Sequence, residues 1–404
     1  MGVVIYDLPD DNDISYYYFP DYQNGTRIFW TSIIDWFGAN FFFGLPFRAW
    51  LSISALILLF IHILILSRKS LRTSSINVIM IGLAITDITF MLFNIFRHFG
   101  FIIDGNFDSC TPVVHLYSLY FFMGFSALAD FSRRASSWLV VFMALIRAVV
   151  IKKGTNPKFK KLQISSSGWI SVLVAMFMAT PITTVEWFRY QFNYVSEEDY
   201  LIDCLPEDRV NNYTFPVFNM SASGFFEAYS ALPLKIYYFS EAITSKFLPC
   251  FISPILTAIL INEINASRRK KSTWRSKNYR ERDNRTTKLV SFMSISFLII
   301  HLPQGLMYTS QIFFVEQLGV TLLMSYFMSF FTTLYILNAA SHLVLCFYLS
   351  NQYRAVVLYI IRLPFAISIQ VPTIQVKNSV GAISTIGNFS QFRTRTPSQV
   401  NIGI

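Results

Sequence analysis

The sequence predicts an all-α membrane protein, a bundle of seven transmembrane helices. Of its 404 residues, 53% are hydrophobic and only 14% are charged, whereas soluble chains carry about 25% charged residues. Seven apolar runs are each close to or longer than the ~20 residues that a helix needs to cross a bilayer. They lie at about residues 48–67, 75–97, 113–147, 165–188, 238–262, 287–310 and 320–348.

The positions of Lys and Arg indicate how the bundle is oriented. The loops after the first, third and fifth runs, together with the tail after the seventh, hold 24 of the 33 basic residues. Basic loops remain on the cytoplasmic side of a membrane. We therefore expect a multi-pass plasma-membrane protein with an extracellular N-terminus and a cytoplasmic C-terminus. Because the net charge of +10 follows from this topology, it does not indicate nucleic-acid binding.

The predicted spans and orientation divide the chain into three regions. Residues 1–46 contain six Asp and one Arg and are rich in Tyr, so we expect an extracellular acidic tail. Residues 47–348 form the seven-helix domain. Residues 349–404 form a cytoplasmic tail with a short amphipathic start and a disordered remainder, since the end of the chain is rich in Ser, Thr and Pro.

The third apolar run contains charged residues, which are unusual inside a membrane span. Asp130 lies roughly 25 Å along the helix axis from Arg147, which is most of a bilayer core, and Arg133 and Arg134 follow Asp130 within about one turn. A charge at such depth costs about 2.5–3.5 kcal/mol and usually faces a water-filled cavity or a partner. Asp130 is three and four positions before the two arginines, so the three side chains can pair with one another. Alternatively, one arginine is left to bind a ligand.

A second candidate set lies in the sixth run. His301, Gln304 and Tyr308 are spaced so that they share one helix face. Together with Asp130, Arg133 and Arg134 they form the predicted ligand-binding site. The alternative for His301 is a neutral histidine packed in the core.

The four cysteines show no metal-cluster spacing, so we expect neither a metal site nor a cofactor. Cys110 and Cys204 fall on the predicted outer side, where an oxidising environment favours a disulfide. Cys250 and Cys346 fall inside runs and are expected to pack. Sequons that fall on the outer side predict glycosylation at Asn24, Asn212 and Asn219.

Several motifs resemble those of rhodopsin-class G-protein-coupled receptors. LAITD at 83–87 is similar to the second-helix motif of that class, and FLIIHLPQG at 297–305 keeps the Phe and Pro of the sixth-helix motif but has His301 in place of Trp. LIR at 145–147 keeps the Arg of the third-helix motif and loses its acidic neighbour. The resemblance implies a set of conformational-switch residues: Asp87, Arg147, Phe297, Pro303, Asn338 and His342.

The departures from these motifs point to a narrower group. The stretches LRTSSIN at 71–77, SSWLVVFMALIR at 136–147, KFLPCFISPILTAIL at 246–260 and SHLVLCFYLSNQYR at 341–354 resemble the nematode serpentine receptor class W. That family is similar in turn to receptors for FMRFamide-type and myosuppressin-type peptides. The resemblance covers about residues 48–356.

The resemblance implies a receptor that carries ligand binding across the membrane to a heterotrimeric G protein. The implied ligand is extracellular and is a neuropeptide, FMRFamide-like, or a chemosensory molecule. No hydrolase or metalloprotease motif is present, so an enzyme is not expected. A transporter or ion channel with a polar site at the bilayer midplane is the alternative, because inward-facing charges would suit that class too.

Overall fold

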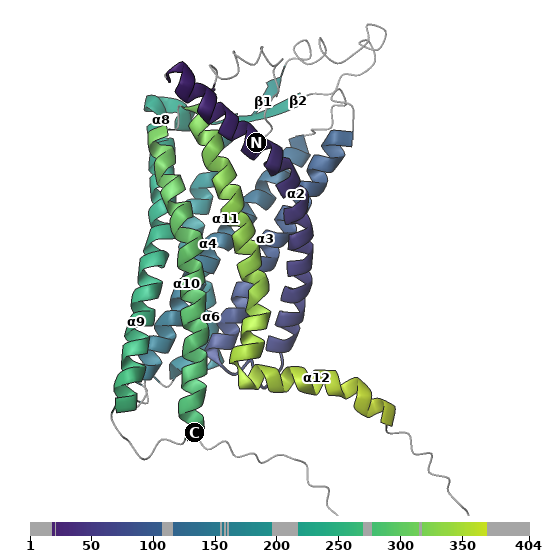
Figure 1. The fold of residues 1–404 in the computed structure, drawn as a ribbon, viewed down its shortest axis with the longest axis vertical. Coiled ribbons are helices and arrows are strands. Elements are labelled where there is room, and N and C mark those ends of the chain that lie inside the picture. The colour runs from purple at the N-terminus through teal and green to yellow at the C-terminus, as the bar shows by residue number, and fades with distance from the viewer. Residues whose placement is uncertain are drawn as a thin grey trace, which may run out of the picture. The chain divides into compact units, whose positions relative to one another are not determined.

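The computed structural model describes residues 18–20, 22–106, 116–153, 156, 159, 161–195, 217–269, 277–314 and 317–369. Its long helices are α2 (Asn24–Leu66), α3 (Ser75–Asn106), α4 (Leu116–Lys153), α6 (Ser165–Trp187), α9 (Leu248–Arg269), α10 (Lys277–Phe314) and α11 (Leu318–Leu349) (Figure 1). Shorter elements are the 3-10 turn η1 (Lys161–Gln163), the helices α8 (Gly224–Glu241) and α12 (Asn351–Ile369), and the π-helical turn η2 (Ala242–Phe247). The described residues up to Tyr359 form one compact unit, and the end of α12 from Ile360 belongs to a second unit.

Among the described residues, seven helical segments are long and apolar enough to cross a membrane. They are Pro46–Leu66, Ser75–Phe99, Leu119–Lys153, Ser165–Trp187, Ala231–Ala266, Thr287–Phe314 and Leu318–Leu349. The predicted seven-helix membrane bundle is therefore confirmed. The third helix begins at Leu116, and the fifth span extends the expected run at 238–262 in both directions.

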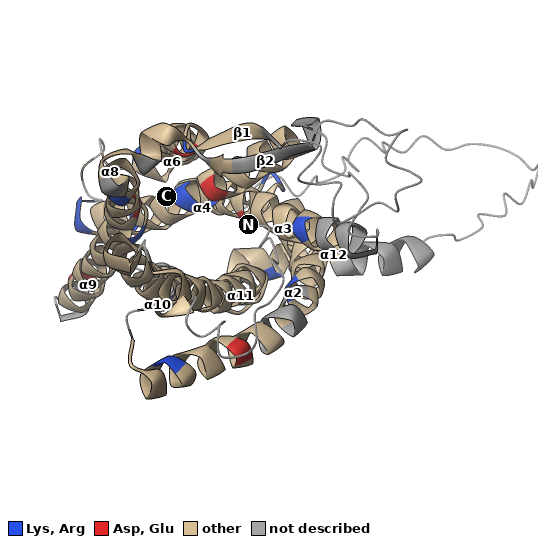
Figure 2. Cartoon of the chain, turned by 90° about the horizontal axis from the view of Figure 1, so that it is seen from above, with Lys and Arg blue, Asp and Glu red and all other residues tan. Residues whose placement is uncertain are grey.

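The helices form a closed ring when viewed along the bundle axis (Figure 2). Helix α2 packs against α3 and α11, α4 packs against α3, α6 and α9, and α10 packs against α9 and α11. Strands β1 (Tyr190–Val195) and β2 (Val217–Ala222) pair antiparallel, with Tyr190 opposite Ala222. We call the end of the bundle beside these strands the sheet end, and the opposite end, where α12 begins, the α12 end (Figure 1).

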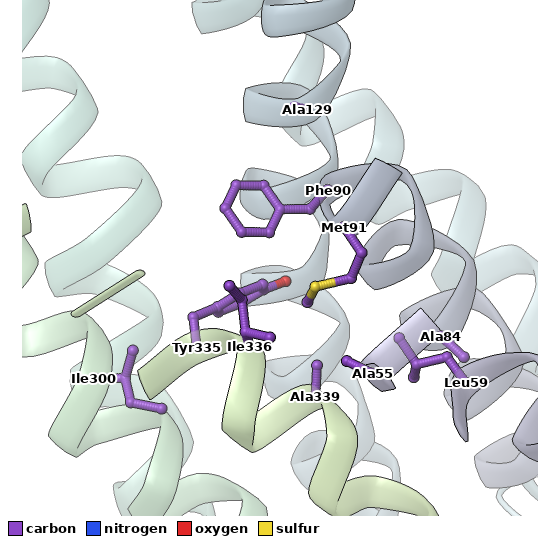
Figure 3. Close-up of a cluster of buried hydrophobic side chains, with 10 residues drawn as sticks. All are labelled: Ala55, Leu59, Ala84, Phe90, Met91, Ala129, Ile300, Tyr335, Ile336 and Ala339. Atoms are coloured by element: carbon purple, nitrogen blue, oxygen red, sulfur yellow. The ribbon is translucent and has the colours of Figure 1, made fainter. Parts of the chain in front are cut away.

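A cluster of buried apolar residues joins five helices at mid-height (Figure 3). The ring of Phe90 on α3 meets the ring of Tyr335 on α11 edge-on, with centroids 5.1 Å apart. Ala55 on α2, Ala129 on α4 and Ile300 on α10 complete the contact between these helices. The small residues allow close approach of the helices around the polar groups described below.

Helix α2 begins inside the segment that we expected to be a tail. Its residues 24–45 precede the membrane span and lie along the sheet end of α11, where Phe37 stacks on Tyr326 with ring centroids 6.0 Å apart. The ring of Phe19 also packs against the start of α11. A Cβ atom at Gly319 would lie 2.5 Å from that ring, so only glycine fits there.

The fifth span is irregular. It runs through the end of α8, the π-helical turn η2 and α9, and it contains Pro233 and Pro254. Near its start Tyr229 and Ala231 have φ of 54° and 57°, values that are uncommon for residues with a side chain. The π-helical turn brings Lys246 into the bundle, where its side chain is 1% exposed. Such turns are frequent at functional sites.

Candidate functional site

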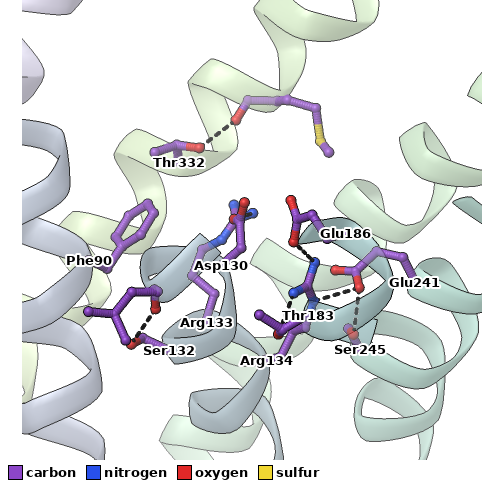
Figure 4. Close-up of polar contacts among 12 residues, drawn as sticks. Phe90, Asp130, Ser132, Arg133, Arg134, Thr183, Glu186, Glu241, Ser245 and Thr332 are labelled. Carbon is purple, nitrogen blue, oxygen red and sulfur yellow. Dashed lines mark hydrogen bonds and ion pairs between the residues drawn. The ribbon is translucent and has the colours of Figure 1, made fainter. Parts of the chain in front are cut away.

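The centre of the candidate site is Arg134, which is 3% exposed. Its guanidinium donates to Glu241 Oε2 on α8 at 2.8 Å and to Glu186 Oε2 on α6 at 2.7 Å. It also donates to Thr183 Oγ1 at 2.8 Å (Figure 4) and to the Tyr237 hydroxyl at 3.2 Å. The planar guanidinium offers five donors in a fixed geometry, and here they join three separate elements of the bundle.

The neighbouring arginine has a different partner. Arg133 forms an ion pair with Asp130 one turn earlier on α4, and its guanidinium lies 5.4 Å from the centroid of the Phe90 ring. Of the two alternatives open from the sequence, self-pairing describes Asp130 and Arg133, while Arg134 pairs with acids of other elements.

Three charged residues that the sequence reasoning missed complete this group. These are Glu186, Glu241 and Lys246, which lie inside the bundle close to Arg133 and Arg134. We call the six side chains the charged cluster: Asp130, Arg133, Arg134, Glu186, Glu241 and Lys246. All three missed residues lie inside predicted apolar runs, so the criterion that singled out Asp130 would have found them.

The charged cluster has no net formal charge, but its side chains differ in how exposed they are. It contains three cations and three carboxylates, and the carboxylates of Asp130 and Glu186 are neighbours (Figure 4). The Asp130 and Glu186 side chains are 23% and 13% exposed, whereas those of Arg134 and Glu241 are 3% and 2% exposed. The accessible side of the cluster therefore carries two carboxylates, with Arg133 (14% exposed) beside them.

The three predicted ligand-binding residues of α10 lie at two different heights along the bundle axis. Tyr308 lies at the charged cluster, with its ring 6.0 Å from Lys246 Nζ and 6.3 Å from the Tyr238 ring. His301 lies nearer the α12 end and stacks on Phe297, with ring centroids 4.1 Å apart. Gln304 is 2% exposed, and its Oε1 has no hydrogen-bond partner within the described residues.

A second polar group, below the charged cluster, brings predicted switch residues together. The Tyr335 hydroxyl donates to Asp87 Oδ1 at 2.5 Å and lies 3.4 Å from Ser136 Oγ. His342 Nδ1 is 3.5 Å from Asp87 Oδ2. These groups line a cavity of ≈ 10 Å³, about the volume that one water molecule needs. Phe297, His301 and Asn338 also line it.

Close approach of α10 to the π-helical turn depends on the residues around Pro303. Pro303 lies inside α10 and removes one backbone donor from the helix. A Cβ atom at Gly305 would lie 3.0 Å from the Lys246 Cβ and 3.2 Å from the Phe247 ring. A larger residue there would therefore push α10 away from Lys246.

At the α12 end, two contacts tie helices together. His62 Nδ1 lies 2.9 Å from the Tyr353 hydroxyl, which connects α2 to α12. Burial raises the pKa of Tyr353 above the ordinary tyrosine value, so this hydroxyl stays protonated. Arg147 is half-buried near the end of α4. In the same region Glu263 Oε1 lies 3.8 Å from Lys152 Nζ.

The remaining predicted sites are only partly described. Cys110, Cys204 and Asn212 lie outside the described residues. Asn24 is exposed at the first residue of α2, and Asn219 lies in β2 opposite Asn193. Two further cysteines, in α9 and α11, are free and buried. Within the described part of the chain, no group of three or more His, Cys, Asp or Glu is placed to hold a metal ion.

Seven apolar spans surround buried polar groups on their inward faces, which is the arrangement of a seven-transmembrane helix bundle. The family model described as "Serpentine type 7TM GPCR chemoreceptor Srw" matches residues 46–364. The chain therefore belongs to this family, and it is a multi-pass membrane receptor and not an enzyme. The transporter or channel alternative is not favoured.

The chain is also similar to "G-protein coupled receptor dmsr-1" of Caenorhabditis elegans, at 23% identity over 262 residues. The match covers 63% of this chain and 50% of that receptor, so the chain spans about half the length of the relative.

Proposed function

We propose that this receptor lies in the plasma membrane with its sheet end outside, binds an extracellular peptide at the charged cluster and signals to a heterotrimeric G protein at the α12 end. The observation that carries the proposal is the charged cluster itself. Six charges inside a membrane bundle are costly, and such charges mark functional sites. The proposed ligand-binding residues are Asp130, Arg133, Arg134, His301, Gln304 and Tyr308, to which we add Glu186.

The exposure of the cluster favours a ligand with a basic group. The neighbouring carboxylates of Asp130 and Glu186 are more exposed than the Arg134 and Lys246 side chains behind them. An incoming guanidinium would meet two acceptors, and arginine–carboxylate pairs are among the strong hydrogen-bonded contacts. A peptide with an amidated C-terminus suits the site further, because it brings no carboxylate of its own.

The second polar group is the proposed switch. Helix α3 is joined to α11 directly beneath the cluster by contacts among Asp87, Tyr335 and His342. The ring of His301 on α10 packs against the ring of Tyr335, with centroids 5.8 Å apart. A ligand that favours one packing of these helices would shift the population of two bundle states. The other proposed switch residues are Arg147, Phe297, Pro303 and Asn338.

The G protein is proposed to bind the basic loops at the α12 end. These are the stretches at 152–161 and 268–282, which are rich in Lys and Arg. Their charge also follows from membrane topology, so charge alone does not carry this part of the proposal.

The test uses a library of amidated peptides on cells that express the receptor, with a second-messenger readout. Each active peptide is made again with citrulline in place of arginine, which keeps the shape and removes the charge. Since a hydrogen bond to a charged group contributes about 1.5–3 kcal/mol, we expect the citrulline forms to lose at least about tenfold in potency.

Receptor variants provide the matching control. Glu186→Gln should reduce the difference between arginine and citrulline peptides, whereas Glu263→Gln, which changes an acid at the α12 end, should leave it intact. The proposal is wrong if no peptide in the library gives a response, or if a peptide opens an ionic current that needs no G protein.

A further inference from the structure

A cavity outside the charged cluster lies between α4 and α6, in the half of the bundle nearer the sheet end. Its volume is ≈ 300 Å³, and it is lined by Phe131, Thr180, Thr183, Thr184, Trp187 and Phe188. This volume is at the lower end of the range for small-molecule sites, which is about 300–1,000 Å³. We call it the α4–α6 cavity.

The walls of the cavity are apolar despite its three threonines. Their hydroxyls donate to backbone carbonyls of the same helix, each at 3.0 Å: Thr180 to Met176, Thr183 to Ala179 and Thr184 to Thr180. The hydroxyl protons are thus already used within α6. What remains at the surface of the cavity is chiefly threonine methyl groups and the rings of one Trp and two Phe residues.

The cavity faces the membrane. It lies within the span Ser165–Trp187, and Thr180, Thr184 and Trp187 are exposed on the surface of α6. The same helix continues with lipid-exposed residues, since Leu173 is 65% exposed and Phe177 is 77% exposed. In the axial view α6 lies at the periphery of the ring (Figure 2). The medium that reaches the cavity is therefore hydrocarbon.

The floor of the cavity touches the charged cluster. Thr183 lines the cavity and accepts a hydrogen bond from Arg134 Nη1 at 2.8 Å. One side chain therefore separates the cavity from the guanidinium. An apolar occupant would keep water away from the Arg134 ion pairs, and ion pairs are stronger where the local dielectric constant is low.

We propose that the α4–α6 cavity binds one acyl chain of a phospholipid from the leaflet at the sheet end. The bound chain keeps water away from the side of Thr183 and Arg134 that faces the cavity. This site is separate from the proposed peptide site, and its test needs no peptide.

The experiment uses the full-length receptor in nanodiscs of phosphatidylcholine with a photoreactive diazirine in one acyl chain. After illumination, adducts are located by peptide mass spectrometry. We expect them to concentrate on Phe131 and on residues 180–188, above the level on the equally lipid-facing residues Leu173 and Phe177. A uniform distribution along the exposed face of α6 would overturn the proposal, because it describes ordinary bulk lipid.

Two variants sharpen the comparison. Thr184→Trp fills the cavity, and we expect it to abolish the concentrated labelling. Met178→Trp adds the same side chain to another exposed position of α6 that does not line the cavity, and we expect labelling to persist. Equal labelling of the two variants would contradict a specific site. Thr180→Phe serves as a second filling variant if Thr184→Trp does not fold, as judged by gel filtration.

Discussion

Arg134 on α4 and Glu241 on α8 are 107 positions apart in the chain, yet their side chains meet at 2.8 Å between Nε and Oε2. Both are almost completely buried, at 3% and 2% exposure. Ser245 also donates to Glu241 Oε2, at 2.9 Å. The pair therefore fixes the start of the irregular fifth span against the third helix, which places Lys246 beside the candidate ligand site.

Loss of one partner in this pair should destabilise the receptor strongly. Glu241→Gln leaves Arg134 buried with one of its two carboxylates, and breaking a buried pair costs about 3–5 kcal/mol. We expect a clear fall in the thermal unfolding temperature of the purified receptor. Glu263→Gln removes the exposed pair with Lys152, where the expected cost is below about 1 kcal/mol. Similar unfolding temperatures for the two variants would contradict the structural role of Glu241.

The contact between Tyr335 and Asp87 should control basal signalling. Tyr335→Phe removes the hydroxyl that donates to Asp87 at 2.5 Å, and a hydrogen bond to a charged group contributes about 1.5–3 kcal/mol. Because this bond joins α3 to α11, we expect the variant to change the second-messenger level without ligand. Tyr348→Phe, an exposed position on the same helix, is the control and should behave like the unmodified receptor.

Three buried hydroxyls should hold α9 and α10 together. Ser294 Oγ lies 2.9 Å from both Ser253 Oγ and Thr257 Oγ1. Ser294→Ala leaves two hydroxyls without this partner, at a cost of about 1–3 kcal/mol, and we expect α10 to separate from α9 more readily. The measurement is the rate at which a cysteine-reactive fluorophore labels a cysteine placed on α10. Ser296, which bonds within its own helix, gives the matched control Ser296→Ala, and a rate no higher than that of the control would refute this role.

The buried phenol of Tyr353 predicts a loss of stability at high pH. Burial raises the pKa of Tyr353, so folding favours the neutral phenol over the phenolate. The stabilisation is complete below the ordinary tyrosine pKa of about 10 and declines as the pH rises above it, because the unfolded chain then loses this proton. In unfolding curves measured above pH ~10, Tyr353→Phe should lose less stability with pH than the unmodified receptor. Parallel curves would count against this assignment.

Much of the architecture could be predicted from the sequence, because each membrane span depends on the length and composition of one continuous segment. Crossing a bilayer requires a long apolar segment with its own internal hydrogen bonds, so length and composition are enough to locate each span. Asp87 and Asp130 could be found in the same way, since a charge within such a segment must face inward. The N-terminal extension of α2 was not predicted, because its helix is supported by packing of Phe37 on Tyr326, which is nearly three hundred positions away.

The sequence by itself determined the class of protein, the number of spans and the positions of most inward charges, because these depend on the cost of placing polar groups in hydrocarbon. Only the tertiary structure decided how those charges are partnered. Two neighbouring arginines of α4 form ion pairs with different acids. Arg133 pairs with Asp130, and Arg134 pairs with Glu186 and Glu241. Helical spacing permits Asp130 to reach either arginine, and the choice follows from which acids the packing of α6 and α8 brings to each guanidinium.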